Sequence, residues 1–193
     1  MAKKQDKSPT VYAFIDSSNI WQAQKSKGQF FDWQKLQRYL KGRYNASEIE
    51  IFYYAAYPAN NTRDYDLDPK HRFYTFLKKG LGFNVRKKKL KRIRVTTEEG
   101  EAWKEKGDMD VEITVDAMHH VEKYDIVLLF SGDSDFMALV SYLRNKDKSV
   151  YVYSSENNIS HELRTGSDGY TDVLKIDAEI WGKKLRHRKQ KRG

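Results

Sequence analysis

Acidic side chains directly follow two apolar runs of the sequence. The run VYAFI is followed by Asp16, and the run IVLLF is followed by SGDSD, which contains Asp133 and Asp135. A third acidic segment, KGDMD, contains Asp108 and Asp110 and stands at the start of an expected helix. Carboxylate oxygens are the ligands that hard divalent cations prefer. The spacing therefore indicates metal chemistry, provided that the fold brings the three segments together.

An aspartate at the start of a helix also has a purely structural use. Asp and Ser accept hydrogen bonds from the first N–H groups of a helix and stabilise it by ~1 kcal/mol. For each aspartate taken alone, capping is the better interpretation. Three or four carboxylates at one site, however, repel one another and lose hydration, which a fold tolerates mainly around a cation. Because the sequence has no cysteine and no histidine pair near these aspartates, the expected ion is Mg²⁺ or Mn²⁺.

The apolar pattern predicts strands that alternate with helices. The expected strands are Val11–Ile15, Glu48–Tyr57, Phe83–Val95, Tyr124–Phe130 and Val150–Tyr153, with a last edge strand at Val173–Ile176. The expected helices are Trp33–Leu40, one opened by Pro69, Asp110–Val121 with Val111, Val115 and Met118 on one stripe, Ser134–Asn145, and a short one from Ser160. Thr96–Lys106 is charged with weak periodicity and is interpreted as a loop. Such alternation predicts an α/β fold with a parallel sheet covered on both faces, which binds ligands at the carboxyl ends of its strands.

Length and charge limit the class of protein. A chain of 193 residues suggests one domain at 11–177, with a basic tail at 1–10 and a basic helix or tail at 178–193. No apolar run approaches the ~20 residues that cross a bilayer, and the polar start carries no secretory signal. We therefore expect a cytoplasmic protein without a membrane partner. A homodimer is left open.

The net charge of +9 is concentrated in two segments. Seven of the nine residues 86–94 are Lys or Arg, and seven of the ten residues 183–192 are. The first cluster indicates a polyanionic partner, which we expect to be single-stranded or structured RNA, although the charge fits DNA as well. For the second cluster, solubility explains the charge equally well. The expected nucleic-acid contacts are Arg86, Lys87, Lys88, Lys89, Lys91, Arg92, Arg94, Lys104 and Lys106. Trp21, which follows Asp16 closely, is expected to pack in the core rather than to stack on a base.

Three segments together carry a family resemblance. FIDSSNI (14–20), KGDMDVEITVDA (106–117) and LLFSGDSDFMALVSYL (128–143) resemble the NYN-domain family of the PIN-like superfamily of metal-dependent ribonucleases. The resemblance spans about Val11 to Ile176. It implies a three-layer α/β/α fold with a mostly parallel five-stranded sheet in the order 3-2-1-4-5, and a Mg²⁺ or Mn²⁺ site.

The resemblance also implies roles for individual residues. Asp16, Asp110, Asp133 and Asp135 would hold the metal and perform catalysis, and Asn19 would hydrogen-bond Asp16 or a water held by the ion. Asp108, Asp116, Ser131 and Ser134 form a second tier. Asp108 competes with its neighbour Asp110, and Asp116 points about 120° away from Asp110 on an ideal helix.

Two other functions compete with a ribonuclease. A catalytically weak RNA-binding module within a larger assembly would explain the basic segments, but negative charge facing phosphate gives a pure binder no advantage. A phosphatase of the haloacid-dehalogenase type needs a D-x-D pair after the first strand, whereas here Ser17 and Ser18 follow Asp16. The leading hypothesis is therefore divalent-metal-dependent hydrolysis of RNA.

Overall fold

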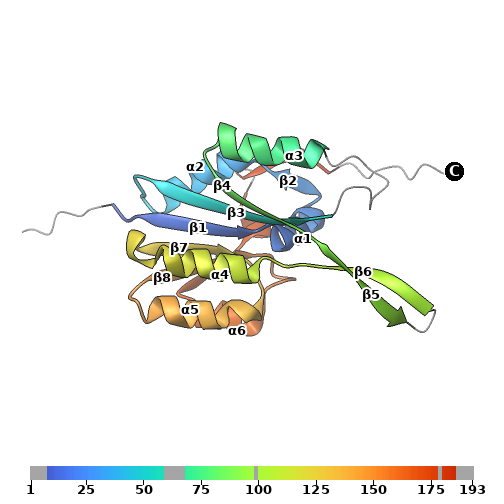
Figure 1. Cartoon of the computed structure of the whole chain (residues 1–193). Coiled ribbons are helices and arrows are strands. Elements are labelled where there is room, and N and C mark those ends of the chain that lie inside the picture. Colours follow the sequence, from blue (N-terminus) through green and yellow to red (C-terminus); the bar gives the residue numbers. More distant parts are fainter. Residues whose placement is uncertain (1–7, 59–67, 98–99, 178–179, 186–193) are drawn as a thin grey trace, which may run out of the picture.

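The computed structural model describes residues 8–58, 68–97, 100–177 and 180–185, and it contains a six-stranded sheet. Its strand order is β4-β3-β1-β7-β8-β9, and every neighbouring pair is parallel (Figure 1). The strands are β1 (Val11–Asp16), β3 (Ile49–Tyr57), β4 (Asn84–Lys89), β7 (Ile126–Phe130), β8 (Ser149–Ser154) and β9 (Gly169–Asp172). The first five follow the expected order 3-2-1-4-5, and β9 adds a sixth strand at the edge.

Helices cover both faces of the sheet, which confirms the three-layer α/β/α fold. One buried cluster joins β1 to the helices α1 (Ser17–Lys27), α2 (Trp33–Arg43) and α3 (Asp68–Thr75), the last of which continues into η1 (Phe76–Gly80). The other joins β1 to α4 (Asp110–His119), α5 (Met137–Arg144) and α6 (His161–Gly166). Alternation along β1 explains this division, because Ala13 and Ile15 belong to the first cluster and Phe14 to the second.

The expected edge strand at Val173–Ile176 was wrong by about four residues. The strand is β9, and residues Val173–Lys175 form the single turn η4. Val173 and Ile176 are buried in the core from this turn, so their apolar character reflects burial rather than strand pairing. The true strand, with the sequence GYTD, has no alternating apolar signal.

Helix α4 forms as expected, but its stripe of Val111, Val115 and Met118 is exposed to solvent. The buried stripe consists of Met109, Ile113, Ala117 and Val121, which follow one another at intervals of four residues. This second stripe extends past both ends of the helix, and it anchors α4 on the sheet.

The segment Thr96–Lys106, which the sequence predicted to be a loop, belongs mostly to a β-hairpin. Strands β5 (Lys91–Thr97) and β6 (Gly100–Lys106) pair in antiparallel register and extend away from the sheet (Figure 1). Most side chains on both faces of this hairpin are exposed, so no apolar periodicity marked it in the sequence. The expected basic strand Phe83–Val95 is therefore divided at Leu90 between β4 and β5.

A second small sheet joins distant parts of the chain. Strand β2 (Gln29–Phe31) pairs with β10 (Trp181–Lys184), which lies in the segment expected to be a helix or tail. Trp181 packs in the core beside Phe31, which holds this strand on the domain. Of the two expected basic tails, residues 1–7, 178–179 and 186–193 lie outside the described residues. No described helix is long and apolar enough to cross a membrane.

Candidate active site

Asp16 lies at the carboxyl end of β1, where the chain turns into α1. It is buried, and its carboxylate accepts hydrogen bonds from the backbone N–H and the hydroxyl of Ser18, at 2.9 to 3.0 Å. The backbone N–H of Asn19 also donates to it. The Asn19 side chain is buried and points elsewhere, because its carbonyl oxygen accepts a hydrogen bond of 3.0 Å from the Ser154 hydroxyl. Asp16 therefore does cap a helix, and Asn19 connects α1 to the end of β8.

The loop after β7 presents Asp133 and Asp135 to solvent. The carboxylate of Asp133 accepts a hydrogen bond of 3.0 Å from the backbone N–H of Asp135, at the start of η3 (Ser134–Phe136). The hydroxyl of the buried Ser131 accepts one of 3.3 Å from the backbone N–H of Asp133. Gly132 packs so closely on the next loop that an added Cβ would stand 2.0 Å from the carbonyl oxygen of Asn158. Gly132 thus permits the close contact between this loop and the loop at Asn158.

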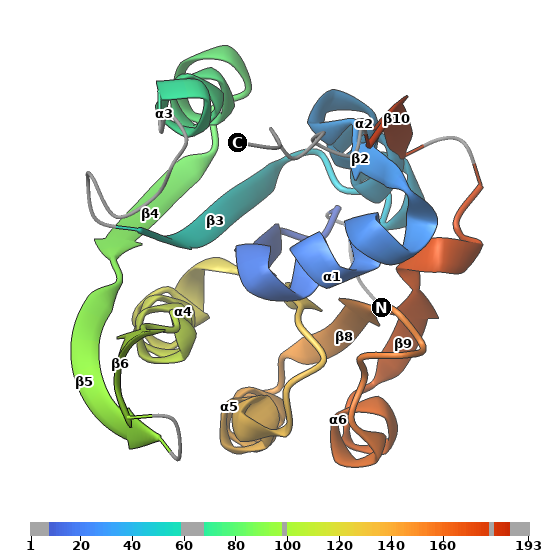
Figure 2. The same cartoon turned by 90° about the vertical axis from the view of Figure 1, so that its right-hand side faces the viewer.

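Asp110, the first residue of α4, completes an acidic cluster with Asp133 and Asp135. One carboxylate oxygen from each of the three residues lies within 4.8 Å of the others. The buried Met109 holds the first turn of α4 against the sheet and so positions Asp110. In Figure 2, which views the carboxyl ends of the strands, α4 and α5 are seen end-on below α1. The structure thus unites three of the four expected metal ligands.

Electrostatics connect Asp16 to this acidic cluster. Burial, followed by the charges of Asp16, Asp108, Asp133 and Asp135, raises the pKa of Asp110 to about 6. Burial also raises the pKa of Asp16, the hydrogen bonds from Ser18 and Asn19 oppose that rise, and the charge of Asp133 adds to it. Unneutralised carboxylates at this spacing destabilise one another, so the set fits a site that binds a cation.

The second-tier aspartates occupy different places. Asp108 is exposed beside the acidic cluster, where its charge contributes to the raised pKa of Asp110. Asp116 lies on another side of α4 and accepts hydrogen bonds from the hydroxyl of Tyr54 at 2.8 Å and from the Arg86 side chain at 3.0 Å. These bonds give Asp116 a structural role in fixing α4 to the sheet. Ser134 is exposed at the start of η3.

The basic residues fall into two groups. On β4, Arg86 is paired with Asp116 at 3.0 Å, Lys88 is paired with Glu112 at 2.7 Å, and the Lys87 ammonium lies over the ring of Tyr74. On the hairpin, the cations are exposed and gather along two strands. These are Lys91, Arg92, Arg94, Lys104 and Lys106. Within residues 86–94, Arg86 and Lys88 on β4 therefore fix α4 to the sheet. The hairpin residues of the same run form an exposed cationic surface.

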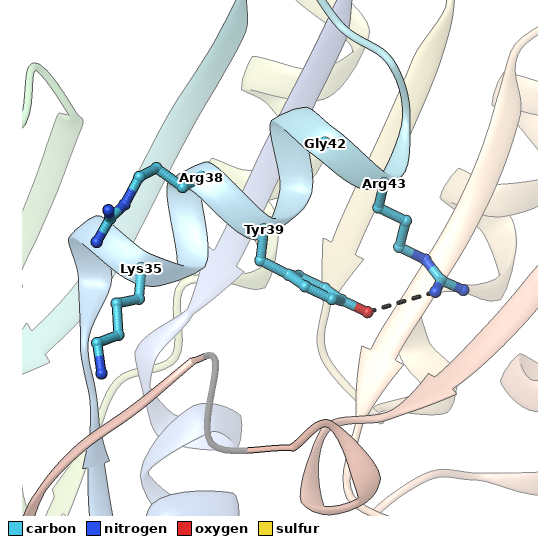
Figure 3. A pocket seen from close by; sticks show the side chains of 5 residues that line it. All are labelled: Lys35, Arg38, Tyr39, Gly42 and Arg43. Atoms are coloured by element: carbon cyan, nitrogen blue, oxygen red, sulfur yellow. Dashed lines mark hydrogen bonds between the residues drawn. The ribbon is translucent and has the colours of Figure 1, made fainter.

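Sequence reasoning missed two serines beside the site and misplaced one aromatic ring. Ser18 and Ser154 hold Asp16 and Asn19, and Ser154 stands at the carboxyl end of β8, where the rule that located the aspartates would also have found it. Trp21 is exposed instead of packing in the core. A pocket of about 700 Å³ on α2 is lined by other residues, Lys35, Arg38, Tyr39, Gly42 and Arg43, and the Arg43 side chain donates a hydrogen bond to Tyr39 within it (Figure 3).

A parallel sheet in this strand order, with carboxylates at the carboxyl ends of its strands, defines a PIN-like α/β protein. The family model of the NYN domain matches residues 10–176, so this chain belongs to the NYN domain family, whose members are related to PIN-like nucleases. It is similar to the low amplitude and bright protein LabA of Synechococcus elongatus, with 32% identity over 168 residues, which cover 86% of this chain and 85% of LabA. It is also similar to the crystal structure of a protein of unknown function from Vibrio parahaemolyticus. That likeness has a TM-score of 0.67 and 26% identity, and it covers 92% of this chain and 99% of the other.

Proposed function

We propose that this protein is a ribonuclease that hydrolyses RNA phosphodiester bonds with a divalent metal ion. The observation that carries the proposal is the acidic cluster, whose oxygens lie within 4.8 Å of one another. Three carboxylates form an all-oxygen donor set, which suits Mg²⁺ or Mn²⁺ rather than softer ions. When bound, such an ion supplies a nucleophilic water and neutralises charge on the phosphate.

The residues of the site divide this work between them. Asp110, Asp133 and Asp135 would hold the ion, and the exposure of the latter two leaves the site open to a large substrate. Asp16, which is buried and hydrogen-bonded at the end of β1, would add a further negative charge and so favour binding of the cation. Asn19, through Ser154, would keep the start of α1 in place. The raised pKa of Asp110 means that the ion competes with a proton at this carboxylate.

The substrate class follows from charge. The two hairpin strands carry five exposed Lys and Arg residues against two glutamates, Glu101 and Glu105, and two more glutamates, Glu98 and Glu99, stand between the strands in the sequence, so we assign the phosphate contacts to the strands. The hairpin projects beyond the carboxyl end of the sheet, where the acidic cluster also lies, and β6 leads into α4 (Figure 1). RNA held along the hairpin could thus reach the acidic cluster.

Cleavage of labelled RNA tests the proposal. Purified protein is incubated with single-stranded RNA, duplex RNA and DNA in the presence of Mg²⁺, Mn²⁺ or EDTA. We expect cleavage of RNA with metal and none in EDTA, and we expect Asp16→Asn to remove nearly all of it. Asp116→Asn is the matched control, because that carboxylate contacts Tyr54 and Arg86 instead of the acidic cluster. Equal cleavage by wild type and Asp16→Asn would identify a contaminant, and RNA binding without any cleavage would favour a binding module.

A further inference from the structure

Two aromatic rings stack on each other at the surface, on α1 and β2. The ring centroids of Trp21 and Phe30 are 6.3 Å apart at an interplanar angle of 29°. Trp21 is 42% exposed and Phe30 is 43% exposed, whereas Trp33 and Trp181 are buried. Large apolar side chains that pair outside the core indicate a contact surface.

Local structure fixes the positions of both rings. The buried side chain of Gln24 accepts a hydrogen bond of 2.8 Å from the backbone N–H of Phe31, which ties β2 to α1. Gly28 ends α1 in the left-handed conformation, at φ 70°, and turns the chain back so that β2 runs beside the helix. The neighbouring Phe31 then packs in the core, while Phe30 faces outward beside Trp21. The pair is therefore a preformed surface, which we call the aromatic platform.

The exposed side of α1 leads from the candidate active site to the platform. Ser18, Trp21 and Lys25 are exposed and follow the three- and four-residue spacing of one helix face. Ser18 donates its hydroxyl hydrogen bond to Asp16, and Trp21 lies five residues beyond Asp16, or about 7.5 Å along the helix axis. That distance corresponds to about two stacked nucleotides at ~3.4 Å each. Figure 2 shows α1 side-on across the carboxyl ends of the strands.

The charges around the platform indicate what binds there. Lys25 is exposed on α1, and Lys183 and Lys184 are exposed on β10, the partner strand of β2. Aromatic rings beside cations are the usual means by which proteins hold single-stranded nucleic acid, with bases on the rings and phosphates on the cations. A second copy of the chain fits less well, since a twofold interface would bring the same lysines together.

We propose that the aromatic platform stacks an unpaired base of the RNA beside the active site, and that the enzyme thereby selects single-stranded RNA. The inference rests on the proposed function, because that function supplies the RNA whose next nucleotides reach the platform. A duplex offers no free base face, so it gains nothing from these rings. Trp103 on the hairpin differs, because Arg92 and Arg94 already lie over its ring at 5.0 and 5.1 Å.

Binding in EDTA tests the platform without any metal-dependent cleavage. The probes are a short labelled oligouridylate and a labelled RNA duplex. We expect Trp21→Ala to weaken oligouridylate binding by about 5- to 100-fold, while duplex binding stays unchanged. Trp21→Phe should retain most of the affinity, since a ring remains. Phe76→Ala is the matched control, because Phe76 is also an exposed aromatic but belongs to η1 rather than to α1 or β2.

Fluorescence gives a second, direct readout. A Trp103→Phe protein keeps three of the four tryptophans, and Trp21 is the exposed one, so oligouridylate should quench its emission and duplex RNA should not. Unchanged oligouridylate affinity in a folded Trp21→Ala protein would overturn the inference, as would equal losses for single strand and duplex. A change in oligomeric state on Trp21→Ala, with RNA binding intact, would instead assign the platform to a second copy and overturn it too.

The two proposals fail in different ways. Binding of oligouridylate through Trp21 by a protein that cleaves no RNA would refute the nuclease and keep the platform. Metal-dependent cleavage that is equal for single strand and duplex, and insensitive to Trp21→Ala, would keep the nuclease and refute the platform.

Discussion

Replacement of Asp110 by Asn should stabilise the metal-free protein. Burial and four neighbouring carboxylates raise the pKa of Asp110 from its usual value of 3.8 to about 6. The difference corresponds to about 3 kcal/mol of destabilisation at neutral pH, at ~1.4 kcal/mol per pKa unit. Solvent screening of this partly exposed group, and the favourable interaction of a carboxylate with the start of a helix, reduce the net gain to about 1 kcal/mol. The melting temperature in EDTA should then rise by about 2–4 °C.

The sign of the pH dependence follows from the same pKa. Because the folded protein holds the Asp110 proton more tightly than the unfolded chain, the stability that this group contributes is present below about pH 4 and is lost as pH rises through about 6. The advantage of Asp110→Asn in EDTA should therefore vanish near pH 4 and be complete above pH 6 to 7. Metal should stabilise wild type by ~2.7 kcal/mol at a hundred times its dissociation constant, and the variant much less. This metal response should itself weaken as pH falls below about 6.

Thermal melts across pH, with EDTA and with Mg²⁺ or Mn²⁺, measure both effects. Asp32→Asn is the matched control, because Asp32 caps α2 by accepting a hydrogen bond from the backbone N–H of Lys35, and Asn caps a helix equally well. It should change neither the melting temperature nor the metal response. If Asp110→Asn melts at or below wild type in EDTA at pH 7.5, and metal shifts both proteins equally, the acidic cluster is a set of capping residues and the reasoning is refuted.

Three further predictions concern the parts that hold the site. Gly132→Ala should cost about 1–3 kcal/mol, because its Cβ would stand 2.0 Å from the carbonyl oxygen of Asn158, and a denaturant melt should register the loss. Ser154→Ala should leave the buried side-chain carbonyl of Asn19 without the hydrogen bond from the Ser154 hydroxyl and cost about 1–3 kcal/mol by the same measurement, whereas full stability would show that water replaces the hydroxyl. Arg92→Ala should reduce the log–log salt slope of single-stranded RNA binding by ~0.7 if it contacts one phosphate, and an unchanged slope would remove the hairpin from the RNA path.

The sequence was most informative where one physical rule constrained many residues at once. Strands that alternate with helices along the chain predicted a parallel sheet. The carboxylates that follow β1 and β7 were therefore expected to lie together at the carboxyl end of that sheet. Asp133 and Asp135 lie there as expected, and Asp110 joins them from the start of α4. Helix periodicity also correctly separated Asp116 from Asp110, and the structure gives Asp116 its own partners in Tyr54 and Arg86.

The wrong predictions concern segments whose sequence carries either two apolar patterns or none. Helix α4 carries two apolar stripes, and only the packed sheet decides that Ile113 and Ala117 turn inward while Val111 and Val115 stay exposed. The hairpin gave no signal because its pairing satisfies backbone groups without burying a face.

The exposure of Trp21 also depends on how its helix packs on the sheet. Trp21 stands beside Ile20, and the two side chains point in directions about 100° apart on the helix. Ile20 is fully buried, so Trp21 turns outward. Composition cannot distinguish that outcome from core packing, since the ring is equally apolar in both. The exposed ring becomes informative only together with Phe30, which reaches it through the turn at Gly28 and the Gln24 hydrogen bond. Gln24 holds the backbone of β2 beside α1, so the local structure places the two exposed rings together. For that reason the platform, rather than exposure by itself, supports the proposed binding of RNA.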